Sequence, residues 1–261
     1  MKKSFICCTA GDRKDWMIRM IDSISYYLQD DWNIYINFQK YQKEDLEEVV
    51  NRIKQYCQND FQYITSNDLD GCHLARVPIL TLFQSDVWLV IDDDMMAIPD
   101  KTKWNDAAEY IYKHKDIALL SCMYYNKNGE INEPVDNLNM FVCTAGGLLL
   151  RDEIAKFVSK IIPPKRYILD NPVWSFYTYM AGYNNILYPD SFCIHEDHST
   201  GGRQTFYELH PINTLSYVPK KYLGKDTTPM IIDFHNNQRK LLLEAINNNQ
   251  DIMEYYKSIE F

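Results

Sequence analysis

Short apolar runs rich in β-branched and aromatic residues alternate in this chain with longer segments whose apolar residues recur at helical spacing. The pattern predicts strands at 4–9, 32–38, 61–64 and 87–91, and helices between them at 16–28, 44–56 and 72–83. Strands that alternate with helices favour a parallel sheet covered by helices. The run Val87–Ile91 contains no polar residue, as expected for a strand with both faces covered. The sequence therefore predicts an α/β fold.

The second half of the chain has a less regular pattern. It predicts helices at 104–114, 172–181 and 237–246, strands at 117–123, 140–150 and 187–194, a turn at 126–130 and a loop at 199–228. No internal repeat, low-complexity tract or convincing linker divides the chain. We therefore expect a single domain over residues 1–261, whose second half carries the specificity.

Charge and cysteine usage narrow the class of protein. The 261 residues carry a net charge of -9, which argues against non-specific binding to nucleic acid or anionic lipid. Seven cysteines, without a Cys-x-x-Cys pair, argue against a zinc ribbon or a secreted disulfide framework. No run approaches the roughly 18 apolar residues of a membrane span, and the start lacks the apolar run of a signal peptide. We expect a cytoplasmic protein without a transmembrane segment.

Three consecutive acids, Asp92, Asp93 and Asp94, directly follow the apolar run Val87–Ile91. In a parallel sheet, ligands bind beyond the carboxyl ends of the strands. Adjacent carboxylates repel each other by about 4 kcal/mol at ~4 Å and an effective dielectric constant near 20, and a divalent cation removes that repulsion. Oxygen ligands favour Mg²⁺ or Mn²⁺. A solvated acidic loop is the alternative, but the abrupt change from apolar to acidic residues favours a metal site.

A second motif lies one strand upstream of the acids. Gly71 stands at a loop-to-helix junction, and Arg76 follows one turn inside the predicted helix. A guanidinium at that place is suited to bind a phosphate with two hydrogen bonds, although a helix arginine is often only a solvated charge. Its position relative to the acids suits a nucleotide diphosphate that lies between the two motifs.

The order of these motifs resembles the GT-A fold glycosyltransferases, in particular the family-2-like nucleotide-sugar transferases. An N-terminal strand ends in a polar turn, Asn-x-x-x-Gly-x-x-x-Ala-Arg spans 67–76, and an apolar strand then leads into Asp-x-Asp at 92–94. The resemblance covers about the first 200 residues. It implies a Rossmann-like, mostly parallel sheet flanked by helices, with an irregular C-terminal acceptor region. The implied parts are a nucleotide-binding half (1–100), a sugar and acceptor half (101–203) and a C-terminal lid and helix (204–261).

The resemblance also implies roles for residues of the first half. The side chains that would hold the nucleotide base are those of Thr9, Ala10, Asp12 and Arg13. Arg76 would lie near the ribose or the diphosphate, Asp92 and Asp93 would face the donor, and Asp92 and Asp94 would ligate the metal. Asp12 and Arg13 are equally compatible with a surface ion pair, which contributes at most ~1 kcal/mol.

Two further segments are candidates for the sugar and acceptor side. Paired glycines, Gly146 and Gly147, within a predicted strand permit a close approach of the backbone to a ligand, or a bend of the sheet. Asp170 precedes a predicted helix, where relatives place the general base that acts on the acceptor hydroxyl, and a helix N-cap is the alternative. Trp174 is suited to stack on a sugar face, although an aromatic residue in the core is commoner.

A polar segment that follows the last predicted strand contains His195, His198 and Arg203. A histidine here resembles the third metal ligand of many metal-dependent members of the fold, and imidazole beside carboxylates shifts the preference toward Mn²⁺. His195 ends the strand and His198 follows three residues later, so both are candidate ligands. Arg203 follows two glycines and would reach the diphosphate when a lid closes.

These features predict a metal-dependent, hexosyltransferase-like glycosyltransferase with Mn²⁺ or Mg²⁺ and a UDP-sugar as co-substrate. The sequence identifies neither the acceptor (glycan, lipid-linked glycan, small molecule, protein or modified nucleic acid) nor the oligomeric state. If the reaction inverts the anomeric centre, Asp170 is the candidate base. A sugar nucleotidyltransferase is an alternative, although the loop after the first strand lacks its Gly-rich pattern. A non-catalytic carbohydrate-binding module on the same fold is another.

Overall fold

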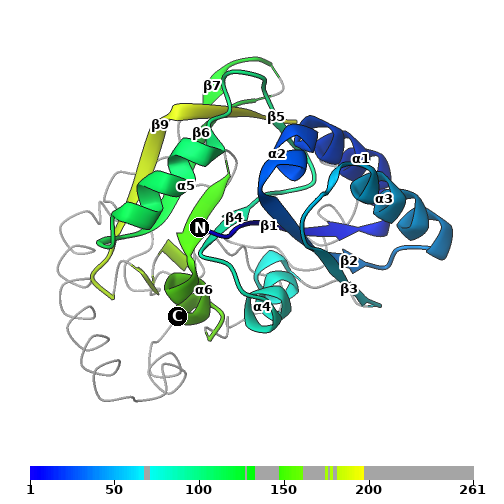
Figure 1. Ribbon diagram of the computed structural model, residues 1–261, viewed down its shortest axis with the longest axis horizontal. Coiled ribbons are helices and arrows are strands. Elements are labelled where there is room, and N and C mark those ends of the chain that lie inside the picture. The colour runs from blue at the N-terminus through cyan, green and yellow to red at the C-terminus, as the bar shows by residue number, and fades with distance from the viewer. Residues whose placement is uncertain are drawn as a thin grey trace, which may run out of the picture.

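The computed structural model of the chain describes residues 1–67, 71–126, 128–132, 147–160, 174–175, 177–178 and 181–196 (Figure 1). The loop expected at 199–228 and the helix expected at 237–246 lie outside the described residues. Within this part of the chain, no helix combines the length and the apolar character that a membrane crossing requires.

The described residues form a nine-stranded sheet in the order β3-β2-β1-β4-β8-β6-β9-β5, with β7 paired to β6. The strands are β1 (Lys3–Ala10), β2 (Trp32–Gln39), β3 (Phe61–Ser66), β4 (Val87–Val90), β5 (Met95–Ala97), β6 (Ile117–Tyr125), β7 (Ile131–Asn132), β8 (Leu148–Arg151) and β9 (Asn184–His195). The pairings make β1, β2, β3, β4, β6 and β9 run in one direction and β5, β7 and β8 in the other. The predicted α/β fold with a mostly parallel sheet is therefore confirmed.

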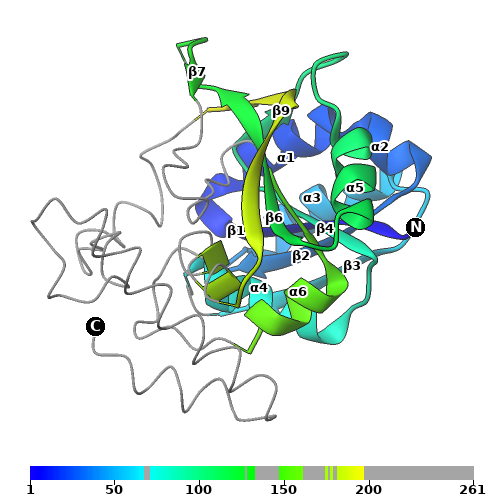
Figure 2. The same cartoon turned by 90° about the vertical axis from the view of Figure 1, so that its left-hand side faces the viewer.

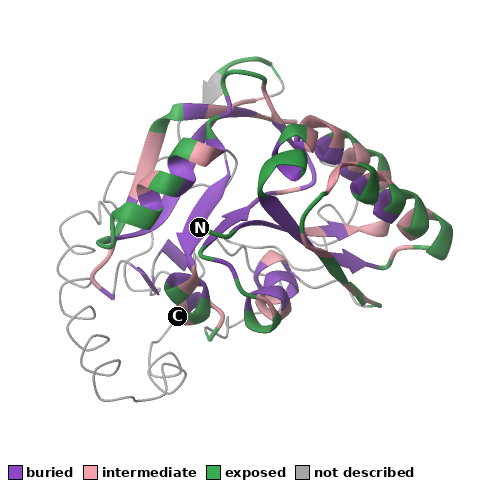
Figure 3. Cartoon of the chain, viewed as in Figure 1, coloured by how far each residue is buried: buried purple, intermediate pink, exposed green. Residues whose placement is uncertain are grey.

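Helices cover both faces of this sheet (Figures 1 and 2). The elements are η1 (Gly11–Arg13), α1 (Lys14–Ser23), α2 (Ser25–Asp30), α3 (Lys43–Tyr56), α4 (Cys72–Leu82), α5 (Trp104–Lys113) and α6 (Asp152–Val158). Contacts and both views place α1, α2, α3 and α5 on one face, and α4 and α6 on the other. Strands β1, β2, β4, β5, β6 and β8 are largely buried, whereas β3 and much of β9 are more open (Figure 3).

The central strands are buried because both of their faces carry apolar or hydrogen-bonded side chains. On one face, Phe5 of β1 stacks on Trp32 of β2, with ring centroids 4.5 Å apart, and Trp104 of α5 packs edge-on against Phe5. Full burial of one such side chain contributes roughly 1.5–3 kcal/mol. On the other face, Tyr35 of β2 stacks on Phe83 at 4.6 Å. This packing fixes β1 and its neighbours, and with them the edge at which β1 and β4 end.

Several elements differ from the sequence prediction. The helix expected at 16–28 is two helices, because the chain departs from helical dihedral angles at Ile24. The helix expected at 72–83 is confirmed as α4, which continues through Pro78 and ends at Leu82. β5 and α6 were not predicted, since three and seven residues are too few for a clear periodicity. Of the helix expected at 172–181, residues 174, 175, 177 and 178 are helical, whereas Ala181 lies in a turn.

β9 contains an irregularity that matters for the site. Its pairing with β6 shifts between Cys122, which lies opposite Tyr188, and Met123, which lies opposite Phe192. Residues 189–191 are therefore extra residues in β9, as in a β-bulge. The chain before α5 holds this corner, because the Lys103 amide donates to Ser191 Oγ at 2.9 Å and the Phe192 amide donates to the Lys101 carbonyl at 3.0 Å.

Arg151, at the end of β8, is a buried charge that holds the second half together. Its side chain is 1% exposed. Its guanidinium donates to four backbone carbonyls around the end of α5 and the start of β6, those of Ile111, His114, Lys115 and Ile117. The carbonyls of Ile111 and His114 lie at the end of α5, where carbonyls have no partner within the helix, and this one side chain supplies donors to both.

Candidate metal centre

The three acids lie where two neighbouring parallel strands end. β1 and β4 pair in parallel, so their carboxyl ends meet at one edge of the sheet. After β4, a turn in which the Met95 amide donates to the Asp92 carbonyl at 3.1 Å carries the acids and leads into β5. The local fold follows from the sequence, because the apolar strand is buried on both faces and the chain becomes polar as it emerges.

His195 reaches the same place from the far side of the sheet. β5 pairs antiparallel with β9, which sets Met95 opposite His195. The Glu196 amide donates to the Asp94 carbonyl at 3.0 Å, so the end of β9 is fixed to the acidic turn. The His195 ring packs edge-on against Tyr124 of β6, with centroids 5.7 Å apart.

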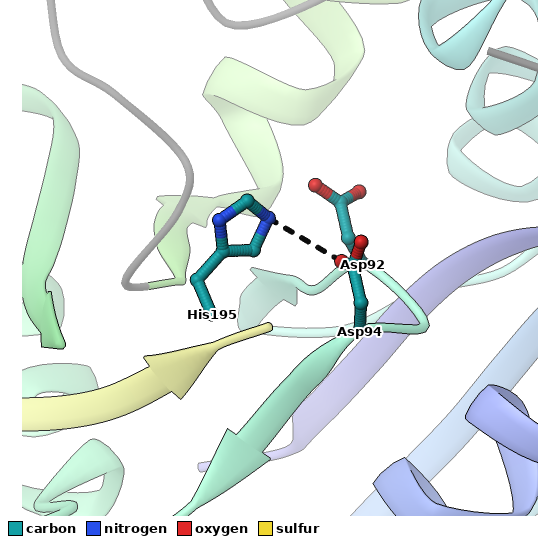
Figure 4. A group of neighbouring side chains, drawn as sticks. All are labelled: Asp92, Asp94 and His195. Atoms are coloured by element: carbon teal, nitrogen blue, oxygen red, sulfur yellow. Dashed lines mark ion pairs between the residues drawn. The ribbon is translucent and has the colours of Figure 1, made fainter. Parts of the chain in front are cut away.

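Asp92, Asp94 and His195 form a group that is suited to bind a metal ion (Figure 4). One ligand atom from each lies within 4.8 Å of the others, and Asp94 Oδ1 lies 3.4 Å from His195 Nε2. Asp94 Oδ1 is buried and forms no hydrogen bond with the described residues, although a buried oxygen ordinarily has a partner. Two carboxylates and an imidazole are ligands that Mn²⁺ accepts readily. The donor set and the buried oxygen therefore fit a divalent cation.

Asp92 is the most open of the three acids, with 31% of its side chain exposed. Arg76 Nη2 donates to Asp92 Oδ1 at 2.5 Å and to the Ile91 carbonyl at 3.3 Å. The Arg76 side chain is 1% exposed, so the pair is shielded from water on the arginine side. The structure thus brings Arg76 to the acidic turn, one turn inside α4 as the sequence indicates.

Asp93 points to a different set of partners. It accepts a hydrogen bond from Thr9 Oγ1 at 2.7 Å, and Arg13 Nε lies 2.8 Å from both of its carboxylate oxygens. Thr9 Oγ1 also lies 3.0 Å from the hydroxyl oxygen of Tyr41. Burial raises the pKa of Asp93 to about 6, although the Arg13 guanidinium acts in the opposite direction. Asp93 is not part of the group that converges with His195.

Asp94 behaves in the opposite way. Burial by itself would raise the pKa of this carboxyl, but His195 and Arg13 hold the pKa well below its ordinary value. Arg13 Nη2 lies 2.8 Å from Asp94 Oδ2. Asp94 is therefore ionised across the neutral pH range, the form in which a carboxylate binds a cation.

Other predicted site residues are placed less centrally. Ala10 ends β1 and Asp12 is exposed in η1. Gly147 has φ +91°, and a Cβ there would approach Leu89 Cδ1 to 3.0 Å, so this glycine serves the packing of β8. Trp174 is fully buried and donates from Nε1 to His73 Nδ1 at 2.7 Å, so its ring is a core aromatic in this structure. Gly146, Asp170, His198 and Arg203 lie outside the described residues.

Sequence reasoning missed three side chains around the site: Tyr41, Tyr124 and Arg19. Tyr41 follows the end of β2, so the rule that ligands gather beyond strand ends would have included it. Tyr124 belongs to β6, and no pattern in the sequence pairs it with His195. Arg19 Nη2 donates to Glu196 Oε1 at 2.5 Å, across 177 positions of the chain.

Known proteins resemble this chain in fold and not in sequence. No protein-family model and no curated protein sequence matches the chain. A mannosyltransferase, PcManGT from Pyrobaculum calidifontis, solved with GDP-Man and Mn²⁺, matches at 14% identity with a TM-score of 0.57, over 78% of this chain and 59% of that one. TarS from S. aureus matches at 15% identity and 0.58, over 80% and 38%. GalNAc-T7 with UDP, GalNAc and Mn²⁺ matches at 10% and 0.57, over 96% and 58%.

These likenesses define the class of fold. Together with the sheet order, they show that the chain has the GT-A fold of glycosyltransferases, as the sequence resemblance implies. The chain spans less than two thirds of the length of each of these three proteins. At such low sequence identities, the structural likeness establishes the fold and not the function.

Proposed function

We propose that the chain is a metal-dependent glycosyltransferase that transfers a sugar from a nucleotide-sugar donor to an acceptor. The observation that carries the proposal is the convergence of Asp92, Asp94 and His195, with ligand atoms within 4.8 Å of one another, at the carboxyl edge of a GT-A sheet. Function belongs to the site more than to the fold, and this site supplies the acids and the histidine that such chemistry needs.

The choice of donor and cation is supported by what the similar structures contain. PcManGT was solved with GDP-Man and Mn²⁺, a form of TarS with UDP-GlcNAc, and GalNAc-T7 with UDP, GalNAc and Mn²⁺. The TarS form matches at 15% identity with a TM-score of 0.57. We propose a UDP-sugar as donor and Mn²⁺ as the preferred cation, with Mg²⁺ as the alternative.

The residues of this chain divide the chemistry between them. Asp92, Asp94 and His195 would hold the cation, and Arg76 fixes Asp92 through the 2.5 Å hydrogen bond. A cation bound there would neutralise the charge that grows on the departing diphosphate, and stabilisation of such charge is the largest contribution in many enzymes. Asp170 as general base, and Arg203 and His198 as further site residues, stay predictions.

A donor screen tests the proposal. Purified protein is incubated with UDP-sugars and GDP-sugars, with Mn²⁺ or with a chelator, and release of the nucleoside diphosphate is measured. We expect slow, metal-dependent hydrolysis of at least one UDP-sugar without acceptor. Release of pyrophosphate from a nucleoside triphosphate and a sugar phosphate would instead support a nucleotidyltransferase. A protein that binds sugar and cleaves no donor would be a carbohydrate-binding module.

Asp94→Asn is the matched variant for this screen. The substitution keeps the size of the side chain and removes the charge that binds the cation, so we expect at least a 100-fold loss of donor turnover by a protein that stays folded. Its melting temperature should fall, because Arg13 and His195 lose their charged partner. Asp22→Asn, in an exposed ion pair with Arg52, is the control and should retain turnover. Near-normal, metal-dependent turnover by the Asp94→Asn protein would remove Asp94 from the mechanism.

A further inference from the structure

Arg13 connects the middle acid to the third acid. It ends η1, directly after β1, and its side chain is 13% exposed. Its Nη2 lies 2.6 Å from Asp93 Oδ1 and 2.8 Å from Asp94 Oδ2, while its Nε donates to both oxygens of Asp93 at 2.8 Å. One guanidinium therefore joins an acid outside the metal-binding group to an acid inside it.

The contact divides the two oxygens of Asp94 between two partners. Oδ2 is held by Arg13, whereas Oδ1 is buried and lies 3.4 Å from His195 Nε2. A hydrogen bond between charged groups is stronger and more directional than one between neutral groups. The Asp94 carboxylate is thus held so that only Oδ1 is directed toward the other members of the metal-binding group, while Oδ2 is held by Arg13.

Asp93 serves as the anchor of this arrangement. Its side chain is 5% exposed, and its carboxylate accepts hydrogen bonds from Thr9 Oγ1 and from Nε of Arg13, with Arg13 Nη2 at 2.6 Å. Because Asp93 is itself fixed by Thr9, it fixes the position of the guanidinium. Asp92 and Asp94 belong to the metal-binding group. Asp93 lies outside it and holds the arginine side chain that orients Asp94.

We propose that Arg13, anchored by Asp93, is a positioning residue that presents Asp94 to a divalent cation as a ligand through one oxygen. The inference rests on the proposed function only for the presence of the cation. It assigns Arg13 to the metal centre, whereas the sequence resemblance implies a place near the nucleotide base.

Electrostatics alone predicts the opposite effect of removing Arg13. A guanidinium beside a cation site repels the cation, so its loss would tighten binding on Coulombic grounds. If Arg13 instead positions Asp94, its removal should weaken binding of the cation. The variant R13M/D93N separates the two effects, because it removes one positive and one negative charge and leaves the net charge of the site unchanged.

The experiment measures binding of Mn²⁺ to the full chain, with free Mn²⁺ followed by electron paramagnetic resonance up to millimolar concentrations. We expect R13M/D93N to bind Mn²⁺ at least 10-fold more weakly than the unmodified protein. R13K keeps the charge but lacks the planar fork, so it should bind three- to tenfold more weakly. The matched control is R52M/D22N, which removes the bidentate pair between α3 and α1 and should bind within twofold of the unmodified protein.

The outcomes separate this inference from the proposed function. Binding by R13M/D93N that equals or exceeds that of the unmodified protein would overturn the positioning role and leave the metal site intact. If R13M/D93N fails to fold, the single variant R13K decides, and unchanged affinity there would overturn the role. Absence of Mn²⁺ binding by the unmodified protein would overturn the metal site itself, and with it the proposed function.

Discussion

In the β3-β2-β1-β4 half of the sheet every neighbouring pair is parallel, whereas the β8-β6-β9-β5 half combines two antiparallel pairs with one parallel pair. The first half supplies the acids within a turn of their own strand. The second half supplies His195 through a pairing between β5 and β9 that joins residues 100 positions apart. The candidate site is therefore local on one side and depends on tertiary structure on the other.

This difference gives the two halves different sensitivities. Asp92 and Asp94 keep their places as long as β4 is buried between its neighbours. His195 keeps its place only if β9 pairs correctly with both β6 and β5. We expect damage to the second half to remove the histidine from the site before it removes the acids.

The largest expected effect is on stability, from Arg151→Met in the second half. The variant removes the donor to four backbone carbonyls, of which those of Ile111 and Ile117 are buried, and a buried carbonyl left without a partner costs about 1–3 kcal/mol. Urea denaturation measures the loss, with Arg52→Met, at an exposed pair, as a control that should cost at most ~1 kcal/mol. A loss for Arg151→Met no larger than that of the control would contradict the role of this arginine.

Gly11→Ala tests the first half. A Cβ at Gly11 would lie 2.3 Å from the Lys40 carbonyl oxygen, so the backbone of η1 must shift, at a cost of about 2 kcal/mol. The shift should also displace Arg13 and weaken Mn²⁺ binding. Gly129→Ala is the comparison, because no atom lies within 4 Å of the added Cβ and only the backbone strain at φ +76° remains, at about 1 kcal/mol. Equal melting temperatures for the two variants would show that η1 tolerates displacement.

His195→Ala isolates the contribution of the second half to the metal centre. The side chain is only 14% exposed and packs against Tyr124, so its removal leaves a cavity and should also lower stability, by roughly 0.5–3 kcal/mol. Loss of one of three ligands should weaken Mn²⁺ binding at least 10-fold, about 1.4 kcal/mol. Calorimetric titration with Mn²⁺ measures the change. Unaltered affinity would mean that the acids alone bind the ion, and the site would then belong to the first half only.

The smallest expected effect is that of Arg19→Ala. Arg19 pairs with Glu196 beside His195, but 52% of its side chain is exposed, and an exposed ion pair contributes at most ~1 kcal/mol. We expect Mn²⁺ affinity within threefold of that of the unmodified protein, and a slightly lower melting temperature. A larger loss of affinity would show that this contact, as well as the strand pairing, positions the histidine.

The same contrast explains how far the sequence predicts the structure. The strands of the first half were predicted because each is a short run rich in apolar, β-branched and aromatic residues, and the acids directly follow the run at 87–91, which is wholly apolar. The metal-binding group was predicted as Asp92, Asp94 and His195 or His198, and the structure brings the first three together. The hydrophobic pattern predicted the strand that leads to His195. It did not predict the partner strand β5, because three residues are too few to show a pattern.

Two other features could not be predicted, because one depends on side-chain orientation within a polar motif and the other on a contact between distant parts of the chain. Nothing in three consecutive aspartates indicates that the middle one turns toward Thr9 and Arg13 while its neighbours face His195. The indole of Trp174 was considered for sugar stacking because the sequence does not indicate burial at an isolated tryptophan. His73, its hydrogen-bond partner, lies 101 positions away.

The three residues 189–191 that β9 carries beyond its ladder with β6 set a rule for length variation in this protein. Because these residues lie outside the ladder, the bulge absorbs a one-residue insertion or deletion among them, and Phe192 stays opposite Met123 and His195 opposite Met95. The same change within 192–195 would shift the register of the strand and turn the imidazole to its other face, away from the aspartates. Functional variants of this chain should therefore differ in length at 189–191 and not at 192–195.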